Sequence, residues 1–147
     1  MTAYVVGFAL DRLGRVALIE KNRPAWQAGK LNGIGGKIEE TDHYPLNAMR
    51  REFEEETGVY VHDWDHFVTM TFPGAEIFFY RARVDDEVLD SLWTNTDETV
   101  RVVHVRRVLD GARGPIIPNL SWLLPLAAYT ADTYQPFGVR AGVAVPA

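Results

Sequence analysis

Cysteine is absent from the 147 residues of this chain. The absence excludes a disulfide-linked scaffold, a zinc site built on thiolates and a cysteine nucleophile. Long apolar runs are missing too, since none approaches the roughly 20 residues that a membrane-spanning helix needs. The first residues, MTAY, lack the basic-then-apolar order of a signal peptide. We therefore expect a cytoplasmic protein that has no membrane partner.

Positive charge is scarce as well. The chain has 15 Lys and Arg residues against 20 Asp and Glu residues, for a formal net charge of −5. This balance disfavours a broad electrostatic contact with DNA or RNA, so we expect no nucleic-acid partner. An acidic protein that binds phosphate groups must supply cations locally, from lysine, arginine or a metal. The length fits a single domain over residues 1–147, and the oligomeric state stays open, a homodimer being one alternative.

Runs of apolar and β-branched residues predict a series of strands. The expected strands cover residues 4–10, 16–20, 59–62, 65–72, 77–84 and 100–105. Residues 22–29, with proline, tryptophan and glycine, are expected to form a loop. Residues 31–38 are glycine-rich, which lets a backbone approach another group closely or adopt positive φ. Residues 131–147 are only weakly patterned.

Two segments have the pattern of helices, residues 46–57 and residues 120–130, the second despite Pro125. In the first, apolar residues recur at i, i+3 and i+7 as one stripe, made by Leu46, Met49 and Phe53. Strand pairs mixed with two helices predict an α/β domain in which a mixed sheet lies between helices.

The first of these helices also carries an acidic face. At 100° per residue, Glu52, Glu55 and Glu56 lie on one side, next to the apolar stripe. A charge run is most often a solvated face. Here, however, Glu52 and Glu56 form a like-charge i,i+4 pair, which costs roughly 0.2–0.5 kcal/mol. Glu55 and Glu56 also lie in the last turn, where the helix dipole disfavours negative charge by roughly 0.3–1 kcal/mol.

These costs favour a site for a divalent cation. Hard oxygen ligands suit Mg²⁺, with Mn²⁺ as an alternative, and Mg²⁺ commonly recruits substrate phosphates as well.

The segment from Gly36 to Val59 resembles the Nudix box, G-x5-E-x7-R-E-U-x-E-E-x-G-U, in which U is a bulky aliphatic residue. Its second half matches at every fixed position, namely Arg51, Glu52, Glu55, Glu56 and Gly58. Its first half departs from the pattern, because one residue is inserted between Gly36 and Ala48. Asp42 or Glu40 is therefore expected to replace the first glutamate of the box.

Two further segments resemble the MutT-like branch, which hydrolyses oxidised purine nucleoside triphosphates. They are residues 29–37 (GKLNGIGGK) and residues 118–126 (PNLSWLLPL), where Asn119 and Leu120 replace two acidic residues of that branch. The resemblance implies a Nudix fold and Mg²⁺-dependent hydrolysis of a nucleoside triphosphate to a monophosphate and pyrophosphate. Two alternatives remain: a pyrophosphohydrolase for ADP-ribose or another nucleoside diphosphate linked to X, and a non-catalytic binding module of the same fold.

The resemblance also assigns roles at the metal site. It implies that Mg²⁺ is held by the Gly36 carbonyl group and by the carboxylates of Glu52, Glu55, Glu56 and Glu98. Glu55 or Glu56 is expected to accept a proton from the attacking water, and Arg51 to orient the glutamates by charge-assisted hydrogen bonds. Glu98, which comes from a distant loop, is alternatively an ordinary loop carboxylate.

For the substrate, we expect Lys37 to contact phosphate and Trp26 to stack on the base. Asn32 and Asn119 each offer a donor and an acceptor, as reading a base edge requires. The alternatives are a surface role for Lys37, a packing role for Trp26 and a helix-capping role for Asn119. Lys21 and Arg23 are weaker phosphate candidates. The four histidines show no ligand spacing and are interpreted as structural or exposed residues.

Overall fold

The central strand of the sheet, β1 (Thr2–Leu10), is apolar on both faces. In the computed structural model, which describes residues 1–131 and 136–142, Val5 and Ala9 lie in one hydrophobic cluster while Phe8 and Leu10 lie in another. Successive residues of a strand point to opposite faces, so this one segment divides the core into two halves. The sheet therefore needs a layer of helices on each side.

In the part of the chain that the structure describes, eight strands form one mixed sheet whose main order is β3-β2-β1-β6-β5-β8. The remaining strands of this order are β2 (Arg15–Glu20), β3 (Leu31–Asn32), β5 (Asp65–Phe72), β6 (Ala75–Arg83) and β8 (Phe137–Arg140). β1 runs parallel to β6 and antiparallel to β2, and β7 (Thr99–His104) pairs with β2.

The arrangement around β1 opens a gap in the sheet. The first half of β1 pairs with β4 (Ile34–Lys37), from Tyr4 opposite Lys37 to Gly7 opposite Ile34. Its last residues pair with β2 instead, Ala9 lying opposite Ala17. β4 and β2 thus pair with the same edge of β1, β4 along its first half and β2 at its last residues. The two strands separate from each other between these two parts of β1.

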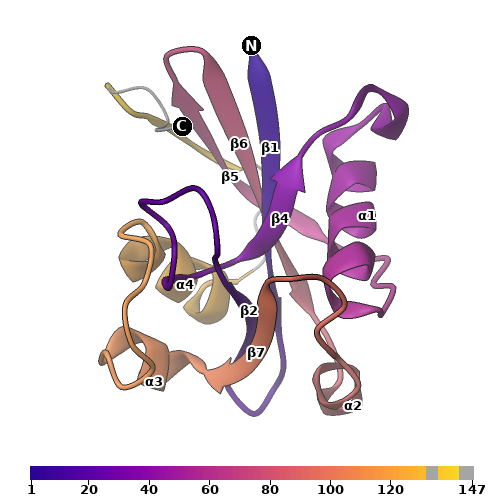
Figure 1. Ribbon diagram of the computed structural model, residues 1–147, viewed down its shortest axis with the longest axis vertical. Helices are drawn as coiled ribbons and strands as arrows, with labels where there is room; N and C mark the ends of the chain where they lie inside the picture. Colours follow the sequence, from indigo (N-terminus) through magenta and orange to yellow (C-terminus); the bar gives the residue numbers. More distant parts are fainter. Residues whose placement is uncertain (132–135, 143–147) are drawn as a thin grey trace.

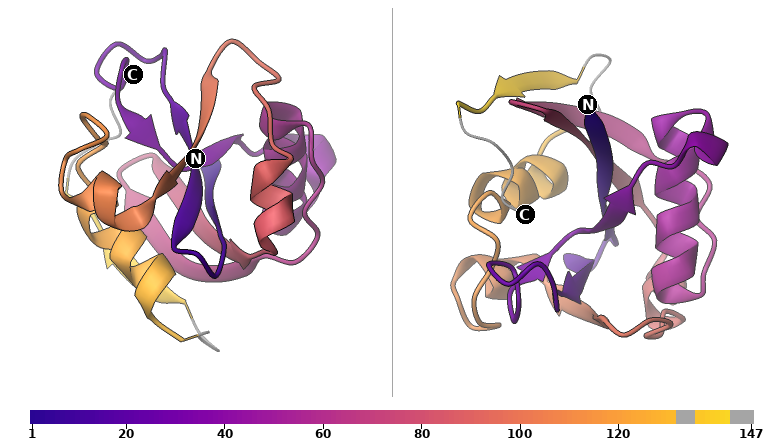
Figure 2. Two further views of the ribbon diagram at one scale, coloured as in Figure 1. Left: turned by 90° about the horizontal axis from the view of Figure 1, so that it is seen from below. Right: turned by 45° about the horizontal axis from the view of Figure 1, so that its top comes forward.

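Helices cover both faces of the sheet, as predicted (Figures 1 and 2). On one face lie α1 (Pro45–Thr57) and α2 (Asp86–Asp90), whose buried residues join the cluster of Val5 and Ala9. On the other face lie α3 (Val105–Leu109) and α4 (Leu120–Tyr129). A short 3₁₀ turn, η1 (Glu40–Asp42), precedes α1. Within the described residues, no helix is long and apolar enough to cross a membrane.

One predicted strand is wrong. Residues 59–62 form no strand, because Gly58 turns the chain at the end of α1 with φ 75° and the segment then packs instead of pairing. Val61 is buried against α1, and its carbonyl oxygen accepts a hydrogen bond from the Trp64 indole. Val61 therefore contributes to the core and not to strand pairing.

Other boundaries also differ from the sequence pattern. Val105 begins α3 rather than ending a strand, and neither α2 nor α3 was predicted, because five residues are too few to show a helical period. Within the weakly patterned tail, β8 adds to the sheet beside β5. The rest of that tail, residues 132–135 and 143–147, lies outside the described residues.

A buried arginine attaches α4 to the sheet. Arg81 of β6 is 1% exposed and donates hydrogen bonds to Asp65 and to the carbonyl oxygens of Leu126, Ala127, Thr130 and Ala131. The last carbonyl groups of a helix lack partners within the helix and carry partial negative charge. One guanidinium therefore satisfies several of them at once and fixes α4 against β6.

Candidate active site

The position of α1 is set by its ends and by one glycine beneath it. Pro45 occupies the first turn, and Gly58 ends the helix in the left-handed conformation with its N–H group bonded to the Glu54 carbonyl oxygen. A Cβ atom on Gly7 of β1 would lie 2.6 Å from the Met49 side chain. The absence of a side chain at Gly7 lets α1 pack closely on β1, which places its acidic face beside β4.

The glycine-rich segment approaches the helix closely at Gly36. A Cβ atom on Gly36 would lie 2.6 Å from Oε1 of Glu52, so any side chain at this position would displace the carboxylate. Of the two explanations for a glycine-rich stretch, close approach applies to Gly35 and Gly36, since neither has positive φ. The Glu52 carboxylate is thereby packed against the backbone of β4.

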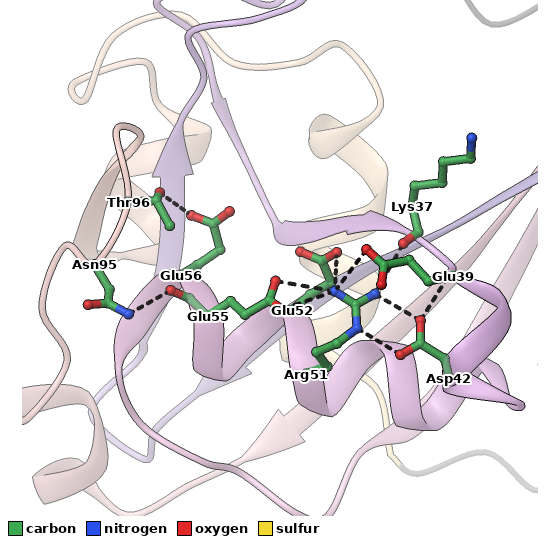
Figure 3. Close-up of polar contacts among 9 residues, drawn as sticks. All are labelled: Lys37, Glu39, Asp42, Arg51, Glu52, Glu55, Glu56, Asn95 and Thr96. Carbon is green, nitrogen blue, oxygen red and sulfur yellow. Dashed lines mark hydrogen bonds and ion pairs between the residues drawn. The ribbon is translucent and has the colours of Figure 1, made fainter.

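Arg51 gathers the acidic groups at the start of this face (Figure 3). Its guanidinium binds Asp42 through two bonds, Nε to Oδ1 at 2.7 Å and Nη2 to Oδ2 at 2.8 Å. The same group donates to Glu52 at 3.0 Å and to Glu55 at 3.2 Å. It also donates to the Lys37 carbonyl oxygen at 3.2 Å. Of the three helix glutamates that the sequence expected it to orient, Arg51 thus contacts Glu52 and Glu55, whereas Glu56 is bound by Thr96.

Asp42, not Glu40, meets Arg51. The Asp42 side chain is buried and also accepts the backbone N–H of Glu39, whereas Glu40 is exposed. The inserted residue of the box is accommodated in η1, which turns Asp42 back toward the helix. Hydrogen bonds from Arg51 hold the pKa of Asp42 below its ordinary value.

The opposite end of the acidic face is held by the loop between α2 and β7. Thr96 donates its hydroxyl to the Glu56 carboxylate at 2.7 Å (Figure 3). Asn95 binds the backbone carbonyl oxygens of Glu55 and Glu56, which lack partners at the end of a helix. The loop thereby delivers Glu98, which is buried and accepts hydrogen bonds from Lys21 and from the backbone N–H of Asn22.

Burial and crowding of like charges raise two pKa values in this site. The pKa of Glu52 rises chiefly through burial, although Arg51 opposes the shift. The pKa of Glu56 also rises chiefly through burial, and the neighbouring charge of Glu98 adds to it, while Thr96 opposes it. Both shifts are the ones expected where carboxylates are grouped away from water.

Within residues 1–131 and 136–142, no three acidic or histidine side chains converge on one point as a ready metal site. The predicted ligands are neighbours, but their oxygens turn toward Arg51, Thr96 and Lys21. The donor set nevertheless fits a hard divalent cation, being made of carboxylates and a carbonyl group. The absence of a side chain at Gly36 lets the Glu52 carboxylate lie against the backbone of β4, which brings a carboxylate next to the residue whose carbonyl group belongs to the same donor set.

A cleft of about 490 Å³ opens where β2 and β4 diverge, and its lining includes Gly36, which lies against Glu52. Three cationic side chains line it, Lys21, Arg23 and Lys37, together with the amides of Gln27 and Asn32. Oδ1 of Asn32 accepts a hydrogen bond from the Gly33 backbone N–H at 2.8 Å. The Nδ2 group of Asn32 is therefore the part of the amide that remains to donate to a ligand. The cleft thus combines positive charge with amide groups.

The predicted substrate residues are only partly brought together. Lys37 and Asn32 line the cleft, but Trp26 does not, since its ring lies beside the Lys30 ammonium at 5.9 Å. Asn119 makes no capping hydrogen bond and instead contacts the sulfur of Met70 at 3.7 Å. Asn119 is therefore not explained as a helix cap, and it lies outside the cleft lining.

Gln27 is a cleft residue that the sequence did not single out. Its side-chain oxygen is buried and has no hydrogen-bond partner among the described residues. A glutamine in a loop has no distinguishing pattern in the sequence, so only the fold reveals it.

Comparison with known proteins identifies the family. A model of the NUDIX domain matches residues 2–122, and the chain therefore belongs to the Nudix family and is a Nudix hydrolase. Members of this family act on nucleoside diphosphates linked to a further group and generally use divalent metals, typically Mg²⁺. No curated protein matches the sequence significantly.

Solved structures share the fold at low sequence identity. A mutator MutT protein from Bacillus halodurans is 16% identical over 97% of this chain and 91% of its own, with a TM-score of 0.71. A NUDIX hydrolase from Nitrosomonas europaea is 14% identical over 95% of this chain and 79% of its own, with a TM-score of 0.70. The NUDIX domain of Shewanella oneidensis NrtR, solved with ADP ribose, is 17% identical over 85% of this chain and 84% of its own, with a TM-score of 0.67.

Proposed function

We propose that this Nudix hydrolase cleaves a nucleoside triphosphate to a nucleoside monophosphate and pyrophosphate. The observation that carries the proposal is the position of Gly36, which lies against Glu52 of the acidic face of α1 and also lines the cleft of Lys21, Arg23 and Lys37. A polyphosphate chain carries several negative charges and needs cations on both sides. The cleft supplies fixed cations, and the acidic face supplies ligands for a divalent cation.

The residues that would hold Mg²⁺ are the Gly36 carbonyl group and the carboxylates of Glu52, Glu55, Glu56 and Glu98. When bound, Mg²⁺ neutralises charge on phosphate oxygens and makes a water molecule a better nucleophile. Arg51 holds Glu52 and Glu55 in place, and its planar fork limits the orientations that these carboxylates can take. Mn²⁺ has the same preference for oxygen ligands and is expected to substitute.

The reaction is a displacement at phosphorus by water. A new P–O bond forms to the water oxygen, the phosphoanhydride P–O bond breaks, and pyrophosphate leaves. The proton of the attacking water passes to a carboxylate of α1, for which Glu55 and Glu56 are the candidates. Glu55 is half-exposed and ion-paired to Arg51, whereas Glu56 accepts only the Thr96 hydroxyl among described partners.

The nucleoside is assigned to the end of the cleft that carries the amides. Asn32 Nδ2 is the group that remains to donate to a base edge, and Lys37 at the rim of β4 is assigned to phosphate. Asn119 and Trp26 remain candidates for the base only if the loop of residues 22–29 changes position on binding, because neither lines the cleft as it stands.

A second substrate class is favoured by one comparison. The NUDIX domain of Shewanella oneidensis NrtR, whose fold this chain shares, was solved with ADP ribose. ADP-ribose would place a diphosphate over the same acidic face and a second sugar where the terminal phosphate of a triphosphate lies. Such a substrate yields AMP and ribose 5-phosphate, and the chemistry at phosphorus is unchanged.

The test is a screen of triphosphates, ADP-ribose and dinucleotides with Mg²⁺, in which products are separated by chromatography. Pyrophosphate and a monophosphate from at least one triphosphate are the expected products. Turnover of ADP-ribose with no turnover of any triphosphate would overturn the proposal in favour of the second class. A chelator control with EDTA, followed by repletion with Mg²⁺ or Mn²⁺, tests the metal requirement.

A further inference from the structure

Two cations that line the cleft are already bound to carboxylates of a single loop. Lys21 lies 3.1 Å from Oε1 of Glu98, and Arg23 forms an ion pair with Asp97. Both cations follow β2 and both carboxylates precede β7, so the two pairs join neighbouring strands across the rim of the cleft. Substrate phosphates and metal ions must therefore compete with partners that the chain itself provides.

The two pairs differ in burial. The side chains of Arg23 and Asp97 are 65% and 63% exposed, and a solvent-screened pair of this kind contributes little. The side chains of Lys21 and Glu98 are only 19% and 7% exposed. A buried carboxylate without a cation is strongly disfavoured, so Glu98 depends on Lys21 in a way that Asp97 does not depend on Arg23.

Glu98 also faces a second carboxylate. The Thr96 hydroxyl donates to Glu56 and accepts the backbone N–H of Glu98 at 3.2 Å, which joins the two residues through one atom. The nearby Lys21 charge acts on Glu56 as well. One ammonium group thus compensates the buried carboxylate of Glu98 and the half-buried carboxylate of Glu56, both of which family resemblance assigns to the metal.

We propose that Lys21 is the internal counter-ion of Glu98 in the metal-free enzyme and that it leaves Glu98 when a divalent cation binds. The inference rests on the proposed function, because it requires Glu98 to be a ligand of the metal. An ammonium and a divalent cation repel each other and need the same carboxylate oxygens. Lysine is a point charge on a flexible four-carbon stem, so its ammonium group can turn from Glu98 into the cleft that it already lines.

This exchange gives Lys21 a defined effect on metal binding. Lys21 stabilises the metal-free site and lowers its affinity for the divalent cation, because the ion pair must break first. A lysine that merely positioned Glu98 for the metal would have the opposite effect, since its loss would weaken metal binding. The sign of the change in affinity therefore separates the two roles.

The experiment compares wild type with Lys21→Met by titrating Mg²⁺ without nucleotide at constant ionic strength. Thermal unfolding reports the metal-dependent rise in Tm, and the loss of the free Mn²⁺ resonance signal reports binding directly. We expect Lys21→Met to have a lower Tm in EDTA than wild type. We also expect it to bind Mg²⁺ and Mn²⁺ roughly tenfold more tightly, which is within the usual range for coupled sites. Lys21→Arg, which keeps the charge, should stay near wild-type affinity.

The matched control is Arg101→Met, which removes a cation from an exposed pair with Glu20 on the same strands. It should change neither Tm nor metal affinity appreciably. If Met is not tolerated at residue 21, Lys21→Gln removes the same charge while keeping a hydrogen-bond donor for Glu98. Unchanged or weaker metal binding in the charge-removing variants would overturn the inference.

Glu98→Gln separates the two proposals. If this variant binds Mn²⁺ more weakly than wild type while Lys21→Met does not bind it more tightly, the metal assignment stands and the counter-ion role of Lys21 fails. If Glu98→Gln leaves Mn²⁺ binding unchanged, Glu98 is not a metal ligand, and the inference falls together with that part of the proposed function.

Discussion

The two ends of the carboxylate cluster, from Asp42 at one end to Glu98 at the other, are bound by different kinds of cation. At one end the planar guanidinium of Arg51 is bound by Asp42, Glu52, Glu55 and the Lys37 carbonyl oxygen, so that its donors are used in a fixed geometry. At the other end a single ammonium, that of Lys21, lies against Glu98. A fork with several partners fixes positions, whereas a point charge on a flexible stem permits exchange. The comparison indicates a scaffold at the Arg51 end and a replaceable contact at the Lys21 end.

The largest expected effect comes from the carboxylates between these two ends. Glu56→Gln should leave folding intact, yet reduce turnover by at least ~10²-fold, the usual scale for losing a catalytic proton acceptor. Steady-state kinetics with saturating Mg²⁺ measure the loss, and Glu55→Gln in parallel shows which carboxylate takes the proton. Glu54→Gln, on the exposed side of the same helix, is the matched control. Near-normal activity in Glu56→Gln would remove it from the catalytic set.

A substitution of the Arg51 guanidinium tests whether this end of the site is a rigid scaffold. Arg51→Lys keeps the positive charge but loses the paired bonds to Asp42, so we expect kcat to fall by at least about tenfold, because misplaced carboxylates slow the reaction steeply. Circular dichroism and kinetic constants for the purified variant check this result. Arg50→Lys, which alters an exposed contact with His62, is the control. A wild-type kcat in Arg51→Lys would mean that charge alone suffices at this end.

The Asp42 contact predicts a pH dependence of stability. The pKa of Asp42 is lower in the folded protein than its ordinary value of 3.8. The ionised carboxylate therefore contributes stability that is present above this value and is lost as the pH falls through the folded-state pKa. At neutral pH, Asp42→Asn should cost roughly 1.5–3 kcal/mol, the range for hydrogen bonds to charged groups.

Urea unfolding of wild type and Asp42→Asn, repeated from neutral to strongly acidic pH, measures that contribution. The difference between the two proteins should shrink toward low pH, where wild type is protonated too. A difference that stays constant with pH would show that packing, rather than charge, makes Asp42 important.

The smallest effect is expected at the nucleoside end of the cleft. Asn32→Ala should weaken kcat/KM for preferred nucleotides by an amount equivalent to roughly 1–3 kcal/mol, the cost of an unpaired polar group. Asn119→Ala should have less effect, because Asn119 lies outside the cleft lining.

Specificity constants for an oxidised and a normal purine triphosphate test the same region. With Asn119 and Leu120 in place of two acidic residues, we expect weak selectivity for the oxidised base. A strong wild-type preference for it would contradict this expectation.

The success of the sequence-based predictions follows the range of the interactions involved. The helix around Glu52 and the Nudix family were predicted correctly, because both depend on local spacing and on residues near one another in the chain. The strand at residues 59–62 was wrong, because burial of Val61 against α1 replaced pairing. The choice between Asp42 and Glu40 stayed open in the sequence, since η1 alone determines which carboxylate turns toward Arg51.

By itself, the sequence determined the α/β class, the acidic helix and the membership of a hydrolase family. These properties depend on periodicity and motif spacing, which are set by residues close together in the chain. Only the tertiary structure decided that Glu98 lies near Glu56 and that Lys21 binds Glu98. It also decided that Gln27, and not Trp26, lines the cleft. These contacts join residues far apart in the chain, such as Lys21 and Glu98. Their geometry depends on how β2, β4 and β7 diverge around β1, and no local pattern of residues records that divergence.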